Sequence, residues 1–494
     1  MKSIQNSRIS RRHWLSVALA AAGMGVSPTL LWADNDHDDR DSDRDSEHSD
    51  GGDSEGRSGS FDSSYQQIAG SGPTGSVVVI GGGMAGATVA KYLRLWGGAN
   101  VAVTLVETDA SYTSNIMSNL VLNGNMRMAQ LGFTHDALVS RYGVTLKRGT
   151  VTAIDSANRS VRLRDGSALS YDRLVVAPGV EFMPAYGLSV ADYDTKTPHA
   201  WRAGAQTALL KQQIDAMADG DTFVMTIPLA PYRCPPGPYE RACLVADTLK
   251  NTGRGNCRVV VLDENAGIQA EKANFANAFQ NIHGTVIDYR SGVTGIQIDP
   301  DTKVVTHDNG ATTIHAAVVS PIPPHRAAGI GAASLDASDN GGWFAQAGLN
   351  NSAVDAASPE FGRWASVNVL SYESTAVPGI HVIGDAASCG LPKAGHVGNQ
   401  EAKICADAIV RLLGGAQPDP APVANSACYS PITRSTASWL TAVYQYDAAS
   451  TKMMVAANGG LTAGAGAVEA SSISTRNYNQ MFTWFNTLMG DSFA

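Results

Sequence analysis

Residues 76–96, SVVVIGGGMAGATVAKYLRLW, decide the fold. The first five are apolar and mostly β-branched, which predicts a buried strand, and the residues after the glycines have the pattern of a helix. A second apolar run, 101–106, ends at Glu107. Strand, glycine-rich turn, helix and second strand form the dinucleotide-binding unit of an α/β Rossmann-like fold.

The glycines of this turn have separate roles. Gly81 makes the tight turn, Gly83 lets the backbone approach a pyrophosphate, and Gly86 permits close packing of the helix. Met84 and Ala85 begin the helix, whose N-terminus stabilises the phosphate charge. The motif therefore predicts a bound dinucleotide.

Four further residues complete the predicted dinucleotide site. Glu107 is placed to accept hydrogen bonds from the adenosine ribose. Residues 171–179, YDRLVVAPG, supply a strand and a turn at Gly179, and residues 374–387, STAVPGIHVIGDAA, end a strand at Gly384 and Asp385. These segments resemble the second and third fingerprints of the two-dinucleotide-domain flavoproteins, in which the late Gly-Asp carboxylate contacts the ribityl chain of FAD. The resemblance implies FAD at the first site.

The middle of the chain predicts a second dinucleotide fold without its ligand. Residues 222–227, TFVMTI, form a strand, but the loop after it, PLAPYRCPPGPYERA at 228–242, is rich in proline and holds a single glycine. Proline removes N–H donors and fixes φ where a phosphate-binding turn needs glycine. We therefore expect no nicotinamide site.

This loop also resembles a particular family. Residues 230–242 are similar to the corresponding loop of the flavoprotein subunit of flavocytochrome c sulfide dehydrogenase, and the resemblance runs from about residue 74 to the C-terminus. The other similar blocks are PHAWRAGAQTALL at 198–210, IPPHRAAGI at 322–330, LPKAGHVGNQEAK at 391–403, NSACYS at 425–430 and the terminal WFNTLMGDSFA.

The resemblance implies a redox-active cysteine pair beside the flavin. Cys234 matches the first member, and Arg233 next to it favours the thiolate. The position of the second member holds Ala365, and Cys389 is the nearby substitute in the sequence. The alternative is that Cys234 is a lone thiol and Cys389 a packed core residue.

The resemblance makes weaker predictions at other positions. The family links FAD covalently through a cysteine at the position of Asn115, so we predict non-covalent FAD here. Lys393 is expected near the flavin pyrimidine, with an ordinary surface lysine as the alternative. A minor interpretation gives proton-handling roles to histidines of the similar blocks, namely His199, His325 and His396.

We expect five segments: a signal at 1–33, an acidic disordered linker at 34–72, a FAD domain at 73–190 and 320–415, an NAD(P)-like domain at 191–319, and a C-terminal domain at 416–494. The expected activity is oxidation of sulfide or a related reduced sulfur compound, with electrons passed to a c-type cytochrome subunit. The alternatives are a sulfide:quinone reductase-like enzyme, or an electron-transfer flavoprotein without sulfide chemistry. Apolar residues at helical spacing near the C-terminus either touch lipid, as the quinone alternative needs, or pack in the core, which we favour.

The N-terminal segment predicts export. Arg11 and Arg12 precede a mildly apolar stretch, which is typical of a twin-arginine signal and indicates the periplasm. That stretch is interrupted by glycine and proline, so we expect no stable membrane anchor. Most of the net charge of −9 comes from residues 34–57, and the acidic balance argues against nucleic-acid binding. No metal site is expected, since no CxxC or clustered histidines occur.

Overall fold

The computed structural model describes residues 72–331, 342–353, 355, 357–358, 360–457, 460–462 and 467–494. The expected signal at 1–33 and all but the last residue of the expected linker at 34–72 lie outside these residues. Both therefore stay predictions from sequence.

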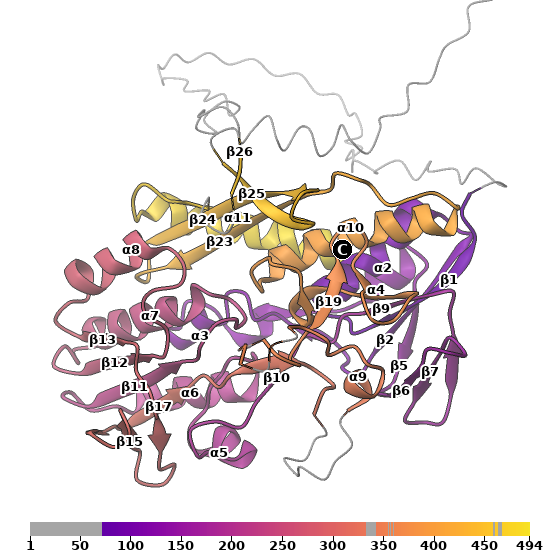
Figure 1. The fold of residues 1–494 in the computed structure, drawn as a ribbon. Coiled ribbons are helices and arrows are strands. Elements are labelled where there is room, and N and C mark those ends of the chain that lie inside the picture. Colours follow the sequence, from indigo (N-terminus) through magenta and orange to yellow (C-terminus); the bar gives the residue numbers. More distant parts are fainter. Residues whose placement is uncertain are drawn as a thin grey trace, which may run out of the picture. The chain divides into compact units, whose positions relative to one another are not determined.

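The first dinucleotide unit belongs to an eight-stranded sheet (Figure 1). Its spatial order is β22 (Ala387–Ser388), β19 (Ala365–Asn368), β20 (Glu373–Ser374), β21 (Ile380–Val382), β9 (Arg173–Val176), β1 (Gly75–Ile80), β2 (Val101–Glu107) and β5 (Thr145–Arg148). The pairs from β21 to β5 are all parallel. The fingerprints predicted from three separate stretches thus end at one edge of one sheet.

Both faces of this sheet are covered, which explains the unbroken apolar run of β1. Val77 and Val79 pack on the side of α2 (Met84–Gly97) and α10 (Gly395–Leu413). Val78 and Ile80 point to the other side, against β6 (Val151–Asp155) and β7 (Ser160–Leu163). Alternate side chains of a strand point to opposite faces, so a strand buried on both faces has no polar alternation.

The second sheet is smaller and also parallel. Its order is β13 (Ile287–Ser291), β12 (Arg258–Asp263), β11 (Thr222–Ile227) and β17 (Val318–Pro321). Phe223 and Met225 pack in one cluster with α7 (Gly237–Asn251), and Val224 packs in another on the opposite face. The strand predicted at 222–227 is confirmed.

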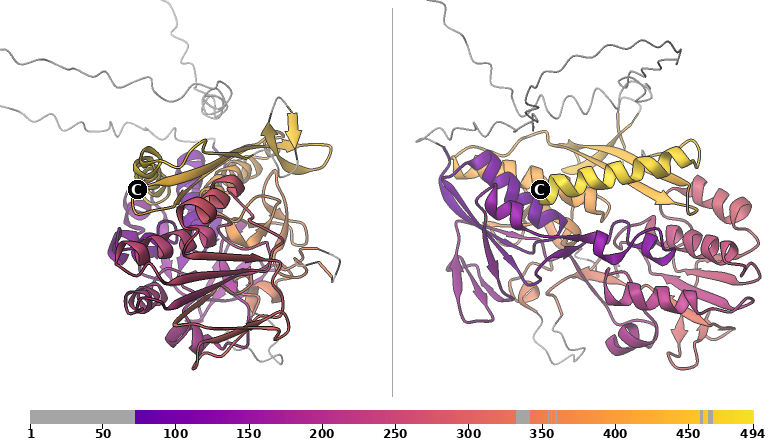
Figure 2. Two further views of the ribbon diagram at one scale, coloured as in Figure 1. Left: turned by 90° about the vertical axis from the view of Figure 1, so that its left-hand side faces the viewer. Right: turned by 180° about the vertical axis from the view of Figure 1, so that it is seen from behind.

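The C-terminal part adds an antiparallel sheet and a long helix. The sheet runs β23 (Val423–Pro431), β24 (Ala437–Asp447), β25 (Lys452–Ala457) and β26 (Gly460–Thr462), and β27 (Val468–Glu469) pairs with β24. Figure 2 shows α11 (Thr475–Phe493) in yellow in the view from behind. Its apolar residues Met481 and Phe485 are buried in the same core cluster as α2, so the expected core packing of this helix is confirmed.

Short elements connect these layers. The helices are α3 (Asn119–Leu122), η1 (Met128–Leu131), α4 (Asp136–Ser140), α5 (Val190–Thr195), α6 (Ala205–Asp215), α8 (Lys272–Asn277), η2 (Ala278–Ile282), α9 (Trp343–Gln346) and η3 (Gly384–Ala386). The strands are β3 (Tyr112–Thr113), β4 (Gly132–Phe133), β8 (Ala168–Ser170), β10 (Val180–Phe182), β14 (Gln297–Ile298), β15 (Val304–His307), β16 (Thr312–His315) and β18 (His325–Ala327). Within the described ranges, no helix is both long and apolar enough to cross a bilayer.

Candidate active site

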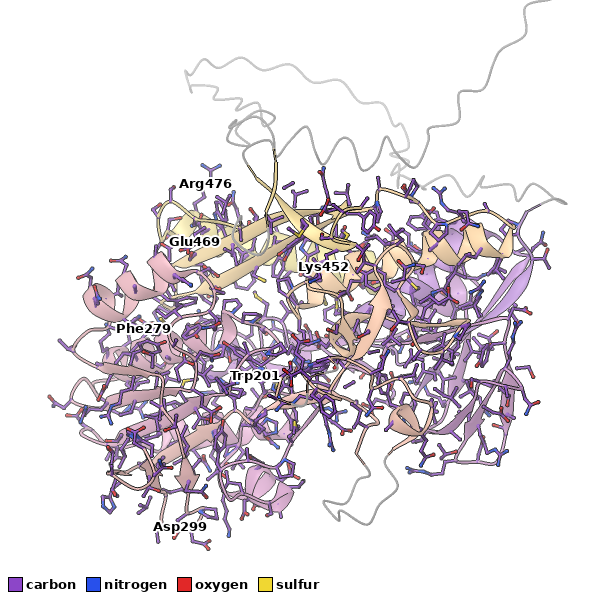
Figure 3. All side chains as sticks on the ribbon, in the orientation of Figure 1. Trp201, Phe279, Asp299, Lys452, Glu469 and Arg476 are labelled. Carbon is purple, nitrogen blue, oxygen red and sulfur yellow. The ribbon has the colours of Figure 1, made fainter. Side chains whose placement is uncertain are left out.

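A cavity of about 1040 Å³ lies where the two parallel sheets, the start of α10 and strand β23 come together. It is lined by the glycine-rich turn, the end of β2, the segment around Asn115, the Pro-rich loop and the first residues of α7. Figure 3 labels Trp201, one of the lining residues, in the region between the second sheet and the first. Most of the residues predicted for the cofactor line this one cavity.

The glycine-rich turn is built as its motif requires. Gly81 has φ of 94°, and a Cβ atom there would lie 2.3 Å from the carbonyl oxygen of Ala177. At Gly86 a Cβ atom would lie 1.7 Å from the carbonyl oxygen of Gly81, so only glycine lets the helix pack this closely. At Gly83 the nearest atoms to such a Cβ are 3.8 Å away, in the ring of Tyr112. The space above Gly83 is therefore open toward the cavity, and Met84 and Ala85 line it too.

The acidic residue after β2 lies directly beside this turn. Glu107 accepts hydrogen bonds from the backbone N–H of Gly82 at 2.5 Å and from those of Thr108 and Asp109 at 2.7 and 2.8 Å. These three donors fix its carboxylate at the end of β2, where it lines the cavity. The carboxylate of Glu107 is thus fixed by backbone hydrogen bonds at the position predicted for a ribose-binding acid.

The later fingerprints reach the opposite part of the cavity. Gly179 and Gly384 both have positive φ, of 72° and 70°, and Asp385 follows in η3. All three line the cavity, and the carboxylate of Asp385 lies 3.9 Å from the guanidinium of Arg233. Asn115 lines the cavity as well, and its side-chain oxygen accepts from the N–H of Ala203 at 2.8 Å. These residues, the open turn at Gly83 and the cavity volume fit a flavin dinucleotide.

Lys393 and Cys389 are two predicted site residues that do not line this cavity. The ammonium of Lys393 donates to the carbonyl oxygens of Asp385 and Ala387, both at 2.8 Å, and lies 3.7 Å from the ring centre of Trp364. The turn at η3 leaves these carbonyls without helical partners, and Lys393 satisfies them. Burial lowers the pKa of Lys393. Its charge thus stabilises the turn that carries Asp385, and its expected role at the flavin pyrimidine stays a prediction.

Cys389 also points elsewhere. Its thiol donates to Glu401 at 3.1 Å, and the residue is buried in the core cluster of α10. Burial, followed by the charge of Glu401, raises the pKa of the Cys389 thiol well above its usual value. This placement corresponds to the packed core residue that the sequence left open as the alternative.

Cys234 lines the cavity and is held in an unusual backbone conformation. Its φ is 60°, in the left-handed region that non-glycine residues avoid at a cost of roughly 1–2 kcal/mol. Its N–H donates to the carbonyl oxygen of Lys393 at 2.7 Å, and the next two residues are prolines. Burial raises the pKa of the thiol to about 12, although Arg233 lowers it as expected. A strained residue held by its surroundings is a frequent sign of function.

Sequence reasoning missed a buried polar group at the start of α7. Glu240 lines the cavity and accepts from the side-chain N–H of Asn119 at 2.9 Å, and burial raises the pKa of its carboxyl to about 8. Arg241 donates to the side-chain oxygen of Asn119 at 3.1 Å and stacks 4.7 Å from the ring centre of Trp201. The one signal in the sequence was the charged pair in PPGPYERA, immediately after a proline-rich loop.

The three histidines of the similar blocks are all held by backbone N–H groups. Each accepts at its Nδ1 atom: His199 from Trp201 at 2.9 Å, His325 from Arg233 at 3.0 Å, and His396 from Ala427 at 3.0 Å. Burial lowers the pKa of His199 to about 3 and that of His396 to about 4, and it lowers the pKa of His325 well below its usual value. All three are therefore neutral at physiological pH and orient the loops around the cavity. Among the described residues, no cluster of three or more potential metal ligands occurs.

Solved structures share this fold. The sulfide:quinone oxidoreductase of Aquifex aeolicus superimposes with a TM-score of 0.64 at 17% identity, over 84% of this chain and 92% of that one. An NAD-dependent persulfide reductase of A. fulgidus gives 0.52 at 15% identity, over 84% and 77%. With two parallel sheets, three fingerprints at one cavity and a C-terminal domain, the protein has the fold of the two-dinucleotide-domain FAD-dependent oxidoreductases, as predicted.

Family models match three successive parts of the chain. The pyridine nucleotide-disulphide oxidoreductase model covers residues 75–213, the central model of the sulfide dehydrogenase (flavocytochrome c) flavoprotein chain covers 207–323, and the flavocytochrome c sulphide dehydrogenase flavin-binding model covers 420–493. The chain belongs to the family of the flavoprotein chain of flavocytochrome c sulfide dehydrogenase. The predicted FAD cofactor and family are both confirmed.

Two curated proteins are similar in sequence to parts of this chain. A ferredoxin–NAD(+) reductase component of the p-cumate 2,3-dioxygenase system of Pseudomonas putida is 27% identical over 363 residues, which is 70% of this chain and 77% of that protein. A probable ferredoxin reductase of Castellaniella defragrans is 36% identical over 105 residues, and this match spans 21% of the chain and 26% of that relative.

Proposed function

We propose that this FAD-dependent oxidoreductase oxidises sulfide or a closely related reduced sulfur compound and passes the electrons to a c-type cytochrome partner. The single observation that carries the proposal is Cys234, a strained thiol that lines the same cavity as the dinucleotide turn. The family models that cover the central and C-terminal parts of the chain support the same substrate class.

The surroundings of Cys234 suit a small anionic sulfur species. Arg233 and Glu240 line the same cavity: Arg233 supplies positive charge, and Glu240 is a carboxyl that burial keeps protonated at neutral pH. A protonated carboxyl does not repel a hydrosulfide anion. FAD, when bound, accepts two electrons together and returns them singly, which matches a haem acceptor.

The Pro-rich loop supports an acceptor other than a nicotinamide. Four of its backbone N–H groups already donate within the protein: Leu229 to Glu264, Ala230 to Asn265, Arg233 to His325 and Cys234 to Lys393. Two of the following residues, Pro235 and Pro236, have no N–H to offer. The loop is thereby engaged in holding Cys234 and offers few donors to a pyrophosphate.

The test is anaerobic titration of the purified full chain, with its flavin, by sodium sulfide. We expect the flavin absorbance to bleach with sulfide, and oxidised cytochrome c to be reduced in the steady state. Cys234→Ser should lose bleaching by sulfide but keep bleaching by dithionite, and Cys257→Ser is the matched control because Cys257 is buried and donates to the carbonyl of Ala218. A flavin that dithionite reduces and sulfide leaves oxidised would refute the sulfur substrate and favour the electron-transfer alternative.

The quinone alternative requires an exposed apolar face on α11 that could contact lipid. The apolar face of α11, which would have to touch lipid, is buried against the protein, with Tyr478, Leu488 and Met489 among its covered residues. Quinone reduction by the purified protein with binding to liposomes would nevertheless establish that activity over the proposed one.

Export is part of the same proposal. The twin-arginine route carries folded, cofactor-loaded proteins, and the pair Arg11 and Arg12 precedes a flavoprotein of this class. Replacing both by lysine should retain the flavoprotein in the cytoplasmic fraction, whereas unchanged recovery in the periplasmic fraction would contradict this route.

A further inference from the structure

The six cysteines fall into two groups by their place in the fold. Four are buried in packed regions: Cys243, Cys257, Cys389 and Cys405. Cys234 and Cys428 are partly exposed, and they are the two cysteines that line the cavity. All six are free thiols in this structure. Two cysteines from distant parts of the sequence thus meet at this cavity: Cys234 on the Pro-rich loop and Cys428 on β23.

The loop that carries Cys234 and the strand that carries Cys428 are both hydrogen-bonded to residues 393–396. The N–H of Cys234 donates to the carbonyl oxygen of Lys393 at 2.7 Å. The N–H of Ala427, next to Cys428, donates to the Nδ1 atom of His396 at 3.0 Å. The segment that leads into α10 thus brings loop and strand to one wall of the cavity, and β23 lies at the edge of its sheet.

The two thiols also share an electrostatic environment. Both thiols line the same cavity, and ionisation of Glu240 would raise the pKa of each of them. Cys389 instead responds chiefly to Glu401, to which its thiol donates. Cys234 and Cys428 therefore share one cavity and one electrostatic environment, and Cys389 lies outside both.

We propose that Cys428 is the redox partner of Cys234, so that the two thiols described here are the reduced form of a disulfide that closes across the cavity wall. This inference rests on the proposed sulfur chemistry and replaces the pairing of Cys234 with Cys389. Closing the bond needs the two Cα atoms to come within about 7 Å of each other.

The exchange step balances without any further reactant. A hydrosulfide anion attacks the sulfur of Cys428, a sulfur–sulfur bond forms between them, and the bond from Cys428 to Cys234 breaks. Its electron pair leaves on Cys234 as a thiolate, and Cys428 holds the persulfide. Burial raises the pKa of both thiols, but Arg233 opposes this rise at Cys234, whereas the neighbouring acidic groups raise the pKa of Cys428 further, so Cys234 is the leaving sulfur. The electron pair on the Cys234 thiolate is then available to a two-electron acceptor.

The sequence makes a direct test possible, because trypsin separates all six cysteines. Cys234 falls in residues 234–241, Cys428 in 412–434 and Cys389 in 364–393. The full-length flavoprotein is treated with diamide, which takes the two electrons and two protons of a dithiol, or with dithiothreitol. It is then alkylated, digested without reduction and analysed by mass spectrometry.

The expected result is a linked species of 234–241 with 412–434 in the diamide sample and its loss after dithiothreitol. Cys389→Ser and Cys257→Ser should keep this linkage, and Cys428→Ser should lose it. A linkage of 234–241 with 364–393, or full alkylation of Cys234 in the diamide sample, overturns the proposal.

A second arm separates this inference from the proposed function. Sulfide added anaerobically to the disulfide form should leave the mass of one extra sulfur on 412–434 and a free thiol on 234–241. If the linkage forms and sulfide does not open it, the pair stands and the sulfide substrate fails. If Cys428→Ser reduces its flavin with sulfide as fast as the unsubstituted protein, the substrate stands and Cys428 is not the partner.

Discussion

Gly83 and Gly86 lie in the same turn, but alanine should have different effects at the two positions. Gly86→Ala should destabilise the fold, and Gly83→Ala should weaken FAD binding. At Gly86 a Cβ atom would lie 1.7 Å and 2.9 Å from the carbonyl oxygen and carbon of Gly81. These are backbone atoms, so the turn itself must move, and overpacking of this kind costs about 1–3 kcal/mol or more. At Gly83 the nearest atoms are 3.8 Å away and φ is −73°, so the apoprotein should lose less than about 0.5 kcal/mol.

The cost of Gly83→Ala should fall on FAD binding. The methyl group would occupy the space through which the backbone approaches the pyrophosphate, and a hydrogen bond to a charged group contributes about 1.5–3 kcal/mol. Loss of one such bond raises the Kd about ten- to hundredfold, since about 1.4 kcal/mol corresponds to a factor of ten.

Two measurements on the same proteins test this reasoning. Urea unfolding of flavin-free protein reports the fold, and quenching of flavin fluorescence on titration reports the Kd. Gly132→Ala is the matched control, because Gly132 has φ of −88°, lies outside the cavity and would place its Cβ 3.8 Å from the nearest atom. Wild-type FAD affinity in Gly83→Ala, or equal apoprotein stability of Gly83→Ala and Gly86→Ala, would refute the argument.

Three other predictions follow from single contacts. Burial raises the pKa of Glu240 to about 8 from 4.5, so the folded state holds an extra proton between these values and stability falls as pH rises through that window. Glu240→Gln should remove up to about 1.4 kcal/mol of that loss per pH unit, and parallel stability curves for both proteins from pH 5 to 8 would contradict this. Lys91 donates to the carbonyl oxygens of Gly490, Asp491 and Ala494 at the end of α11, so Lys91→Met should lower the free energy of unfolding by about 2–3 kcal/mol in urea. Because Asn115 cannot form a thioether, acid precipitation should release all FAD into the supernatant, and flavin retained in the pellet would show a covalent link.

Local patterns in the sequence were sufficient for the fold and for most of the cofactor site. Gly81, Gly86 and Glu107 could be predicted because their roles are steric or geometric within one short strand–turn–helix unit. Gly384 and Asp385 were predicted from a resemblance that spans a single strand end. Such features depend on neighbours in the chain, so their spacing carries the information.

The tertiary structure decided where the reactive side chains meet. Proximity to Asp385 in the sequence suggested Cys389, but the chain turns through β22 and places that thiol on Glu401. Lys393 likewise serves the carbonyls of the η3 turn. Cys428 reaches the cavity of Cys234 only because the start of α10 anchors both the Pro-rich loop and β23. No local pattern encodes such a contact, because it results from the packing of segments almost two hundred residues apart.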